Sequence, residues 1–192
     1  MPQKLSTKRA TFSPAYIPRV LLFGLCLLLA GAGVTAQAPD GEILNGSELV
    51  EGFDIGINSS GGKTDWLSRE PDYLKMAFPA NQSWAAMFIT VGPPTDPPRP
   101  SMDFSAFKTL SLEMRGAEGG EKVEVGIKTN TQPDNGRETK VTYTLEPNWV
   151  TYKIPLYRFK GADPKHLYVV TEFVYNGRTP QTVYVRNIKY IK

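Results

Sequence analysis

Two tryptophans and a short polar turn carry side chains suited to binding chemistry. Trp66 lies in the polar run 64–68, where a Trp either covers the core or forms an exposed platform. Trp84 begins an apolar run, so it is either a binding residue or packed in the core. The segment 175–178 combines Tyr175, Asn176 and Arg178 in one turn, which is also compatible with an ordinary hairpin. Aromatic faces stack on apolar C–H patches of sugar rings, and planar polar groups bond to their hydroxyls. These residues are therefore candidates for a carbohydrate site.

Glu172 stands out because it lies within 167–175, the most apolar of the expected strands. A buried carboxylate is costly unless it is paired or faces a groove. An ion pair with Lys128, Arg137 or Arg186 would account for it, and so would a place in a binding groove. The candidate carbohydrate-binding residues are thus Trp66, Trp84, Glu172, Tyr175, Asn176 and Arg178.

The scarcity of Cys and His argues against several kinds of catalysis. The chain has one Cys and one His, which excludes an intramolecular disulfide, a Cys-based zinc site and a pair of His ligands. His166 follows Pro164-Lys165 in a loop and has no nucleophile motif to serve, so we interpret it as a surface residue. The G-x-S-x-G, GxGxxG, P-loop and H-E-x-x-H patterns are absent from the sequence. We expect no catalytic residue, cofactor or metal site.

The elements that must position these residues are short strands. After Gln37 no stretch keeps a helical apolar period, whereas many stretches alternate with a period of two. The run 167–175 is apolar on both faces and is expected at the centre of a sheet, and the period of 182–191 slips near Asn187, which indicates a bulge. Together with Gly- and Pro-rich turns, this predicts an antiparallel β-sandwich of eight to nine strands. The expected strands are 48–53, 73–78, 85–91, 109–115, 122–128, 139–145, 149–156, 167–175 and 182–191.

The first 36 residues have the order of a secretory signal peptide. A basic stretch leads to thirteen uncharged residues (20–32), and Val34-Thr35-Ala36 offers small residues for cleavage. The apolar run is shorter than the ~20 residues of a membrane-spanning helix. We therefore expect a signal peptide over 1–36, a short flexible segment over 37–47 and one β-sandwich domain over 48–192. The protein would be secreted or periplasmic, without membrane insertion after removal of the leader.

Removal of the leader also changes the charge balance of the chain. The formal net charge is +3, with 22 basic and 19 acidic residues, but four of the basic residues and none of the acidic ones precede Gln37. The remaining chain carries 18 basic and 19 acidic residues and has no long basic run. Nucleic-acid binding is therefore disfavoured.

Six motifs follow one another along the chain: 52–54 (GFD), 82–84 (QSW), 103–110 (DFSAFKTL), 114–123 (MRGAEGGEKV), 148–156 (NWVTYKIPL) and 183–190 (VYVRNIKY). In this order they resemble the galactose-binding-like jelly roll of many carbohydrate-binding modules. The resemblance implies two sheets with a sugar site on a concave face or on the loops at one edge, and a mostly structural role for Trp149. It also implies a structural calcium site with an Asp in the last strand, where this chain has Arg186, which cannot ligate calcium. Asp54 would remain as a ligand.

These observations predict an exported, non-catalytic carbohydrate-binding module that acts through a preformed groove with aromatic and polar side chains. Its partner would be a polysaccharide or oligosaccharide. The alternative is a protein-interaction or structural module of the cell envelope with the same fold and no sugar site, whose partner would be an envelope protein. An aromatic-lined concave groove favours the first hypothesis, and a flat apolar patch favours the second.

Overall fold

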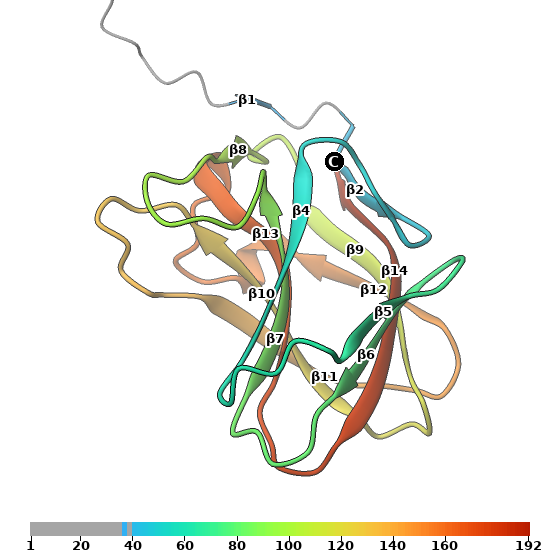
Figure 1. The fold of residues 1–192 in the computed structure, drawn as a ribbon. Coiled ribbons are helices and arrows are strands. Elements are labelled where there is room, and N and C mark those ends of the chain that lie inside the picture. Colours follow the sequence, from blue (N-terminus) through green and yellow to red (C-terminus); the bar gives the residue numbers. More distant parts are fainter. Residues whose placement is uncertain (1–35, 38–39) are drawn as a thin grey trace, which may run out of the picture. The chain divides into compact units, whose positions relative to one another are not determined.

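The computed structural model describes residues 36–37 and 40–192, which fold as two packed antiparallel sheets (Figure 1). The expected signal peptide over 1–36 lies almost wholly outside the described residues. No helix in the described part of the chain has the length and apolar character needed to cross a membrane.

Sheet A is built around five long neighbouring strands. Their order is β4 (Phe53–Ser59), β7 (Ala85–Val91), β13 (Leu167–Tyr175), β10 (Lys122–Thr129) and β11 (Thr139–Thr144). Two short strands, β8 (Met102–Asp103) and β1 (Ala36–Gln37), extend one end of this sheet, and β1 pairs with β8 in parallel.

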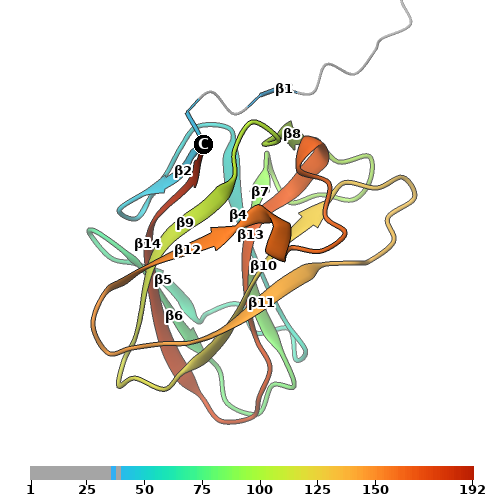
Figure 2. The same ribbon diagram turned by 180° about the vertical axis from the view of Figure 1, so that it is seen from behind.

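Sheet B is built around the last strand of the chain, β14 (Gln181–Ile191). One side of β14 pairs with β9 (Thr109–Gly116), which in turn pairs with β12 (Val150–Pro155), and Figure 2 shows these three strands side by side. The other side pairs first with β6 (Leu74–Phe78) and then with β2 (Glu42–Asn45). The short strands β5 (Leu67–Arg69) and β3 (Glu48–Leu49) lie beside β6 and β2. Two 3-10 turns, η1 (Leu156–Arg158) and η2 (Pro164–His166), complete the fold.

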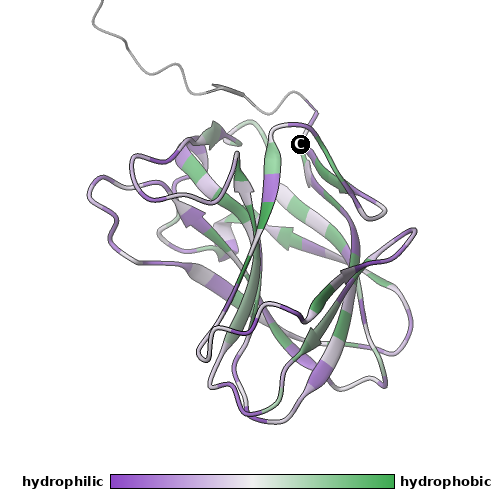
Figure 3. Cartoon of the chain, viewed as in Figure 1, coloured by the Kyte–Doolittle hydropathy of each residue, from purple (hydrophilic) through white to green (hydrophobic). Residues whose placement is uncertain are grey.

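The core lies between the two sheets, and the period-two pattern of the sequence decides which side chains enter it. Leu110, Leu112 and Met114 of β9 are buried in it, as are Val123 and Val125 of β10. Polar residues alternate with them, so apolar and polar colours alternate along many strands in Figure 3. The face of each sheet that is turned away from the core is called its outer face below.

Two sequence predictions about individual strands are confirmed. All nine residues of β13 are buried, because the strand has β7 on one side and β10 on the other. In β14 the pairing with β9 shifts register between Arg186 and Lys189, and Asn187 takes a φ of 52°. The Asn187 side chain accepts a hydrogen bond from the Gly46 amide at 2.9 Å and donates one to Glu113 at 3.1 Å. Asn tolerates this left-handed conformation better than most residues, so it suits the bulge.

The beginning of the domain differs from the expectation. Residues 37–47 were expected to be a flexible segment, but residues 42–45 form β2 in sheet B, and Ile43 and Leu44 are buried. Two adjacent apolar residues have no visible alternation, so this strand left no period-two signal. The structure also contains more strands than the eight or nine expected, because β1, β3, β5 and β8 have only two or three residues each.

Candidate functional site

A groove lies on the outer face of sheet A, over its central strands. One row of neighbouring residues crosses all five long strands here. Successive side chains of a strand point to opposite faces. Because Met87 and Phe173 point into the core, their neighbours Phe88 and Glu172 point outward. From β4 to β11, the row consists of Gly56, Phe88, Glu172, Gly126 and Lys140.

The two glycines of this row let the larger side chains lie flat on the sheet. A Cβ at Gly56 would come within 2.1 Å of Phe88 Cε2, and a Cβ at Gly126 would come within 2.3 Å of Glu172 Oε1. Real carbon atoms do not approach this closely, so both positions require glycine in the present arrangement. The Phe88 ring, which is half-buried, and the Glu172 carboxylate therefore form the floor of the groove.

The groove has a volume of about 410 Å³ and combines aromatic, amide and charged side chains. Trp84, immediately before β7, is 37% exposed and offers aromatic surface to solvent. Asn176, immediately after β13, is exposed and donates a hydrogen bond from Nδ2 to Glu124 Oε2 at 2.7 Å. The lining residues are Asn58, Trp84, Ala86, Phe88, Glu138, Lys140, Glu172, Val174 and Asn176.

Glu172 has an incompletely satisfied carboxylate. The residue is only 3% exposed, and its Oε1 has no hydrogen-bond partner among the described residues. Burial raises the pKa of this carboxyl to about 7, and the negative charge of Glu138 adds to the rise, while Lys140 opposes it. The Lys140 ammonium is itself paired with Glu138 at 3.0 Å. A buried acceptor without a donor is costly in a folded protein, so Glu172 is suited to receive a hydrogen bond from a ligand.

The ion pairs expected for Glu172 do not form. Lys128 pairs with Asp134 at 3.2 Å, and Arg186, which belongs to sheet B, pairs with Glu113 at 2.8 Å. Arg137 forms no ion pair with Glu172 within the part of the chain that the structure describes. A place in the groove therefore accounts better for this carboxylate.

Three of the six candidate residues lie together in this site, and three do not. Trp84, Glu172 and Asn176 line the groove. Trp66 is only 4% exposed, packs on Phe78 with ring centroids 5.0 Å apart and donates from Nε1 to the Lys63 carbonyl at 2.9 Å. It is therefore a cover of the core and not an exposed platform.

Tyr175 and Arg178 are likewise outside the groove. Tyr175 is 5% exposed and stacks on Phe78 at 5.1 Å, because it follows the outward-facing Val174 and so points into the core. Arg178 lies beyond the turn as an exposed side chain and is not among the lining residues. These two side chains therefore do not join Asn176 in the groove, and the ordinary hairpin that the sequence also allowed accounts for this turn.

Sequence analysis missed the floor of the groove, above all Phe88. The run AAMFITV of β7 is apolar on both faces, so its pattern did not reveal which residues face outward. The polar lining residues Asn58, Glu138 and Lys140 come from strands or loops far apart in the sequence. Only the register of β4, β7, β13, β10 and β11 brings them to one place.

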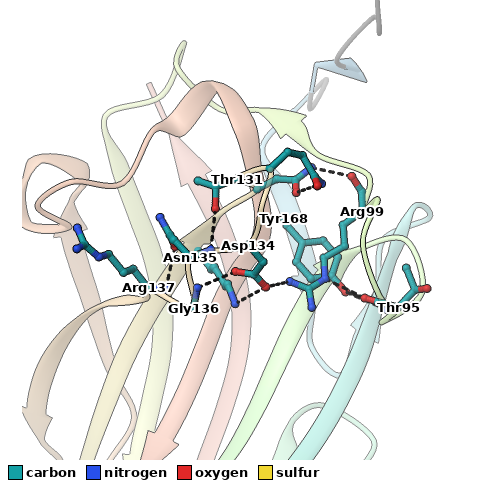
Figure 4. A network of polar contacts seen from close by, with 11 residues as sticks. Thr95, Arg99, Thr131, Asp134, Asn135, Gly136, Arg137 and Tyr168 are labelled. Atoms are coloured by element: carbon teal, nitrogen blue, oxygen red, sulfur yellow. Dashed lines mark hydrogen bonds and ion pairs between the residues drawn. The ribbon is translucent and has the colours of Figure 1, made fainter.

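A polar network fixes the loops beside the groove (Figure 4). The Arg99 guanidinium, from the proline-rich loop after β7, pairs with Asp134 and lies 4.8 Å from the Tyr168 ring centroid. Asp134, from the loop between β10 and β11, also accepts from Lys128 at 3.2 Å and from the Gly136 amide at 2.9 Å. The Gly136 bond, with help from Arg99 and Lys128, lowers the pKa of Asp134 to about 2. The two loops are thus tied together by a carboxylate that is ionised at neutral pH.

The residues at the calcium position implied by the resemblance do not fit a cation. Arg186 is held by Glu113 and, at 3.4 Å, by Asp72, so the position carries an internal positive charge. Asp54 lies in the other sheet and accepts a hydrogen bond from the Ile55 amide. No group of three or more His, Cys, Asp or Glu side chains that could hold a metal ion was found among the described residues.

The two-sheet fold agrees with comparisons to known proteins. The model of carbohydrate binding domain 30 matches residues 62–192. The chain belongs to this family. A family 30 domain is a binding module rather than a catalyst, which agrees with the resemblance to carbohydrate-binding modules seen in the sequence. A search of curated proteins found no match.

Solved structures of carbohydrate-binding modules share the fold of this family 30 domain. The family 30 module of the cellulosomal cellulase Cel9D-Cel44B of Clostridium thermocellum is 19% identical, with a TM-score of 0.61 over 81% of this chain and 98% of that one. A variant of a family 29 carbohydrate-binding module is 16% identical, with a TM-score of 0.53 over 78% of this chain and 89% of that one. At these identities the likeness concerns the fold alone.

Proposed function

We propose that the outer-face groove of sheet A binds a neutral polysaccharide or oligosaccharide. The observation that carries the proposal is the unpartnered Oε1 of Glu172, which lies in the groove floor beside the aromatic side chains of Phe88 and Trp84. A sugar ring offers both complements, because its C–H face stacks on aromatic rings and its hydroxyls donate hydrogen bonds.

Three polar lining residues, Glu172, Asn58 and Asn176, offer hydrogen bonds to a sugar in this proposal. A sugar hydroxyl donates to Glu172 Oε1 and removes the cost of the unpaired acceptor. The Asn58 oxygen accepts from the Ser59 amide at 2.8 Å and Asn176 donates to Glu124, so the Nδ2 donors of Asn58 and the Oδ1 acceptor of Asn176 are the groups offered to the ligand. Trp84 stacks on a sugar ring at the exposed rim, and Phe88 supports a ring from below.

The charge of the groove favours a neutral ligand. Glu138 and Glu172 line the groove with Lys140 as the one basic lining residue, and Glu124 borders it through Asn176. Lys128, which also acts on Glu172, is paired with Asp134. Lys140 is already paired with Glu138. An acidic sugar would bring another negative charge into this region, so a glycan with uncharged rings is the better complement.

The shape of the groove supports the proposal of a preformed site. Phe88 and Glu172 are laid flat by Gly56 and Gly126, and the adjacent loops are tied by Asp134. Few side chains need to be ordered when the ligand binds, which reduces the entropic cost of association.

We further propose that the module is exported, as the leader-like segment 1–36 indicates, and acts outside the cell or in a periplasm. The presence of aromatic side chains in a groove favours a carbohydrate over the alternative of an envelope protein as its partner.

Isothermal titration of the protein with a panel of neutral oligosaccharides tests this function. We expect saturable binding that is lost in Trp84→Ala and weakened in Glu172→Ala. Trp149→Ala is the matched control, because Trp149 precedes β12 in sheet B and takes no part in the groove. Absence of binding to every neutral glycan, or equal loss in the Trp149 variant, would contradict the proposal.

A further inference from the structure

The outer face of sheet B carries cations interleaved with aromatic rings. The register places Lys75 of β6, Tyr184 of β14 and Arg115 of β9 in one row. Trp149 continues the row at the start of β12, since Val150 pairs with Met114. Three spacings of about 4.8 Å separate the four strands, so the row extends for about 14 Å.

The rings of this row hold the guanidiniums in place. Arg115 lies 3.8 Å from the Tyr184 ring centroid and 5.3 Å from that of Trp149. Arg186 lies 4.3 Å from the Trp149 ring, and Tyr73 packs against both Trp149 and Tyr184. A stacked guanidinium keeps its edge N–H groups available for a carboxylate, and its orientation is fixed before binding.

Most of these cations lack an internal counterion. Arg186 is paired with Glu113 and Asp72, but Lys75 and Arg115 have no ion pair within the described residues. The only hydrogen bond that Arg115 donates there goes to the Gly116 carbonyl at 3.3 Å. Lys75 and Arg115 thus differ from Arg186, whose charge is neutralised by carboxylates of the same chain.

Two lysines extend this positive surface along the strands. Lys189 of β14 and Lys153 of β12 are the register neighbours of Ser111 on β9, one on each side. All three line a hollow of about 410 Å³ on the outer face of sheet B, together with the acidic residues Glu42 and Glu113, of which Glu113 is paired with Arg186. Neither lysine forms an ion pair in the part of the chain that the structure describes. We call Lys75, Arg115, Lys153 and Lys189 the basic strip.

The basic strip contrasts with the groove on the opposite sheet, where carboxylates outnumber cations. After residue 36 the chain holds 18 basic and 19 acidic residues, so the strip does not reflect a general excess of positive charge. The same face of sheet B also carries Glu42 and Glu113, but Glu113 is paired with Arg186, so the four cations of the strip leave a local excess of positive charge. A ligand of the strip must therefore be anionic, and it differs from the neutral ligand proposed for the groove.

We propose that the basic strip is a second binding surface, for a polyuronate, that is, a polysaccharide with a carboxylate on its sugar rings. The carboxylates pair with Arg115 and the lysines, and the C–H patches between them contact Trp149, Tyr184 and Tyr73. A guanidinium binds a carboxylate through two parallel hydrogen bonds, which makes Arg115 the anchor.

A polyuronate fits this face better than an acidic peptide does. Its rings are stiff, and each joins an apolar patch to a charge, in the same alternation as the aromatic and cationic side chains of the row. The carboxylates of a peptide are held on flexible stems, whose ordering costs free energy on a flat face. The proposal does not depend on sugar binding in the groove.

Titration of the protein with a pectate oligosaccharide and with its methyl ester at low salt tests this second surface. We expect binding of the pectate only, and weakening at high salt because the contacts are ionic. Arg115→Gln and Lys75→Gln should each reduce the affinity by about tenfold. Arg115→Lys should fall between the wild type and Arg115→Gln, because it keeps the charge but loses the second hydrogen bond.

Two control variants show whether pectate binds at the basic strip or elsewhere on the protein. Lys160→Gln removes one exposed lysine outside the strip and should leave pectate affinity unchanged, as should Trp84→Ala in the groove. Equal binding of the methyl ester, no effect of Arg115→Gln in a variant that unfolds at the wild-type temperature, or an equal effect of Trp84→Ala would overturn the proposal. Equally tight binding of a polyglutamate peptide would overturn the choice of a polyuronate.

Discussion

The carboxylate of Glu172 on β13 lies over the backbone of Gly126 on β10, where a Cβ would stand only 2.3 Å from Oε1. Because Gly126 has no side chain, the carboxylate has room to lie in the groove floor. Its Oε1 has no hydrogen-bond donor in the described structure. The absence of a side chain at residue 126 is therefore part of the candidate site.

Gly126→Ala is expected to displace the Glu172 side chain and weaken sugar binding. Crowding a tightly packed position costs about 1–3 kcal/mol of stability. In a Glu172→Ala background the same change should cost clearly less, because the Glu172 atoms that the new Cβ would meet are gone and the flexible Lys140 side chain, with Cγ at 2.9 Å, is the close neighbour that remains. Urea unfolding of the four proteins measures this coupling, and equal costs in both backgrounds would show that Glu172 does not occupy the space over Gly126.

The pKa of Glu172, which burial raises to about 7 from its ordinary 4.5, should be visible in the pH dependence of stability. A raised carboxyl pKa means that the folded state holds the proton more tightly than the unfolded state. The contribution of Glu172 to the free energy of unfolding is complete below about pH 4.5. It decreases by about 3 kcal/mol as the pH rises through about 7. Glu172→Gln should lack this fall, and unfolding of both proteins by urea across this range provides the comparison. Parallel curves would contradict the shift.

Asp134→Asn should loosen the two loops beside the groove. The variant loses the charge that binds Arg99 and Lys128, with an expected loss of about 1–2 kcal/mol near neutral pH. Because the folded-state pKa is lowered to about 2, the advantage of the wild type is present above about pH 4 and shrinks as the pH falls through 2. Hydrogen exchange of residues 92–101 and 130–138 should accelerate in the variant. Unchanged exchange in both segments would show that Asp134 does not hold them together.

Trp84→Ala should mainly reduce sugar affinity, whereas Trp66→Ala should mainly reduce stability. Trp84 is substantially exposed, so its loss should reduce sugar affinity by about tenfold or more while the free energy of unfolding changes little. Trp66 is buried against Phe78, so its loss should cost about 3–5 kcal/mol of stability. Thermal unfolding and titration of both variants provide the check. A folded Trp84→Ala protein with wild-type affinity would remove Trp84 from the site.

Much of the sandwich was readable from local sequence patterns. The run 167–175 is apolar on both faces, and the structure has it as β13, between two other strands. The slip of period near Asn187 corresponds to the bulge in β14. By contrast, β2 was missed because Ile43 and Leu44 are adjacent buried residues in a strand of only four residues.

The groove was only partly readable because it depends on register. Glu172 was detectable as a carboxylate in an apolar run, and Trp84 and Asn176 as residues that border strands. Phe88 was not detectable, because every neighbour in β7 is also apolar or small. Tyr175 illustrates the same limit. Neighbouring residues of a strand point to opposite faces of the sheet, so Tyr175 enters the core although Val174 and Asn176 line the groove.

The most direct test of the central claim is a titration of the isotope-labelled protein with neutral oligosaccharides, followed by NMR. Binding in the groove predicts that the shifted signals include the Trp84 indole N–H and the side-chain amides of Asn58 and Asn176, while the Trp149 indole N–H stays in place. Shifts that cluster at Trp149 and Tyr184, or no shifts with any neutral glycan, would contradict the account.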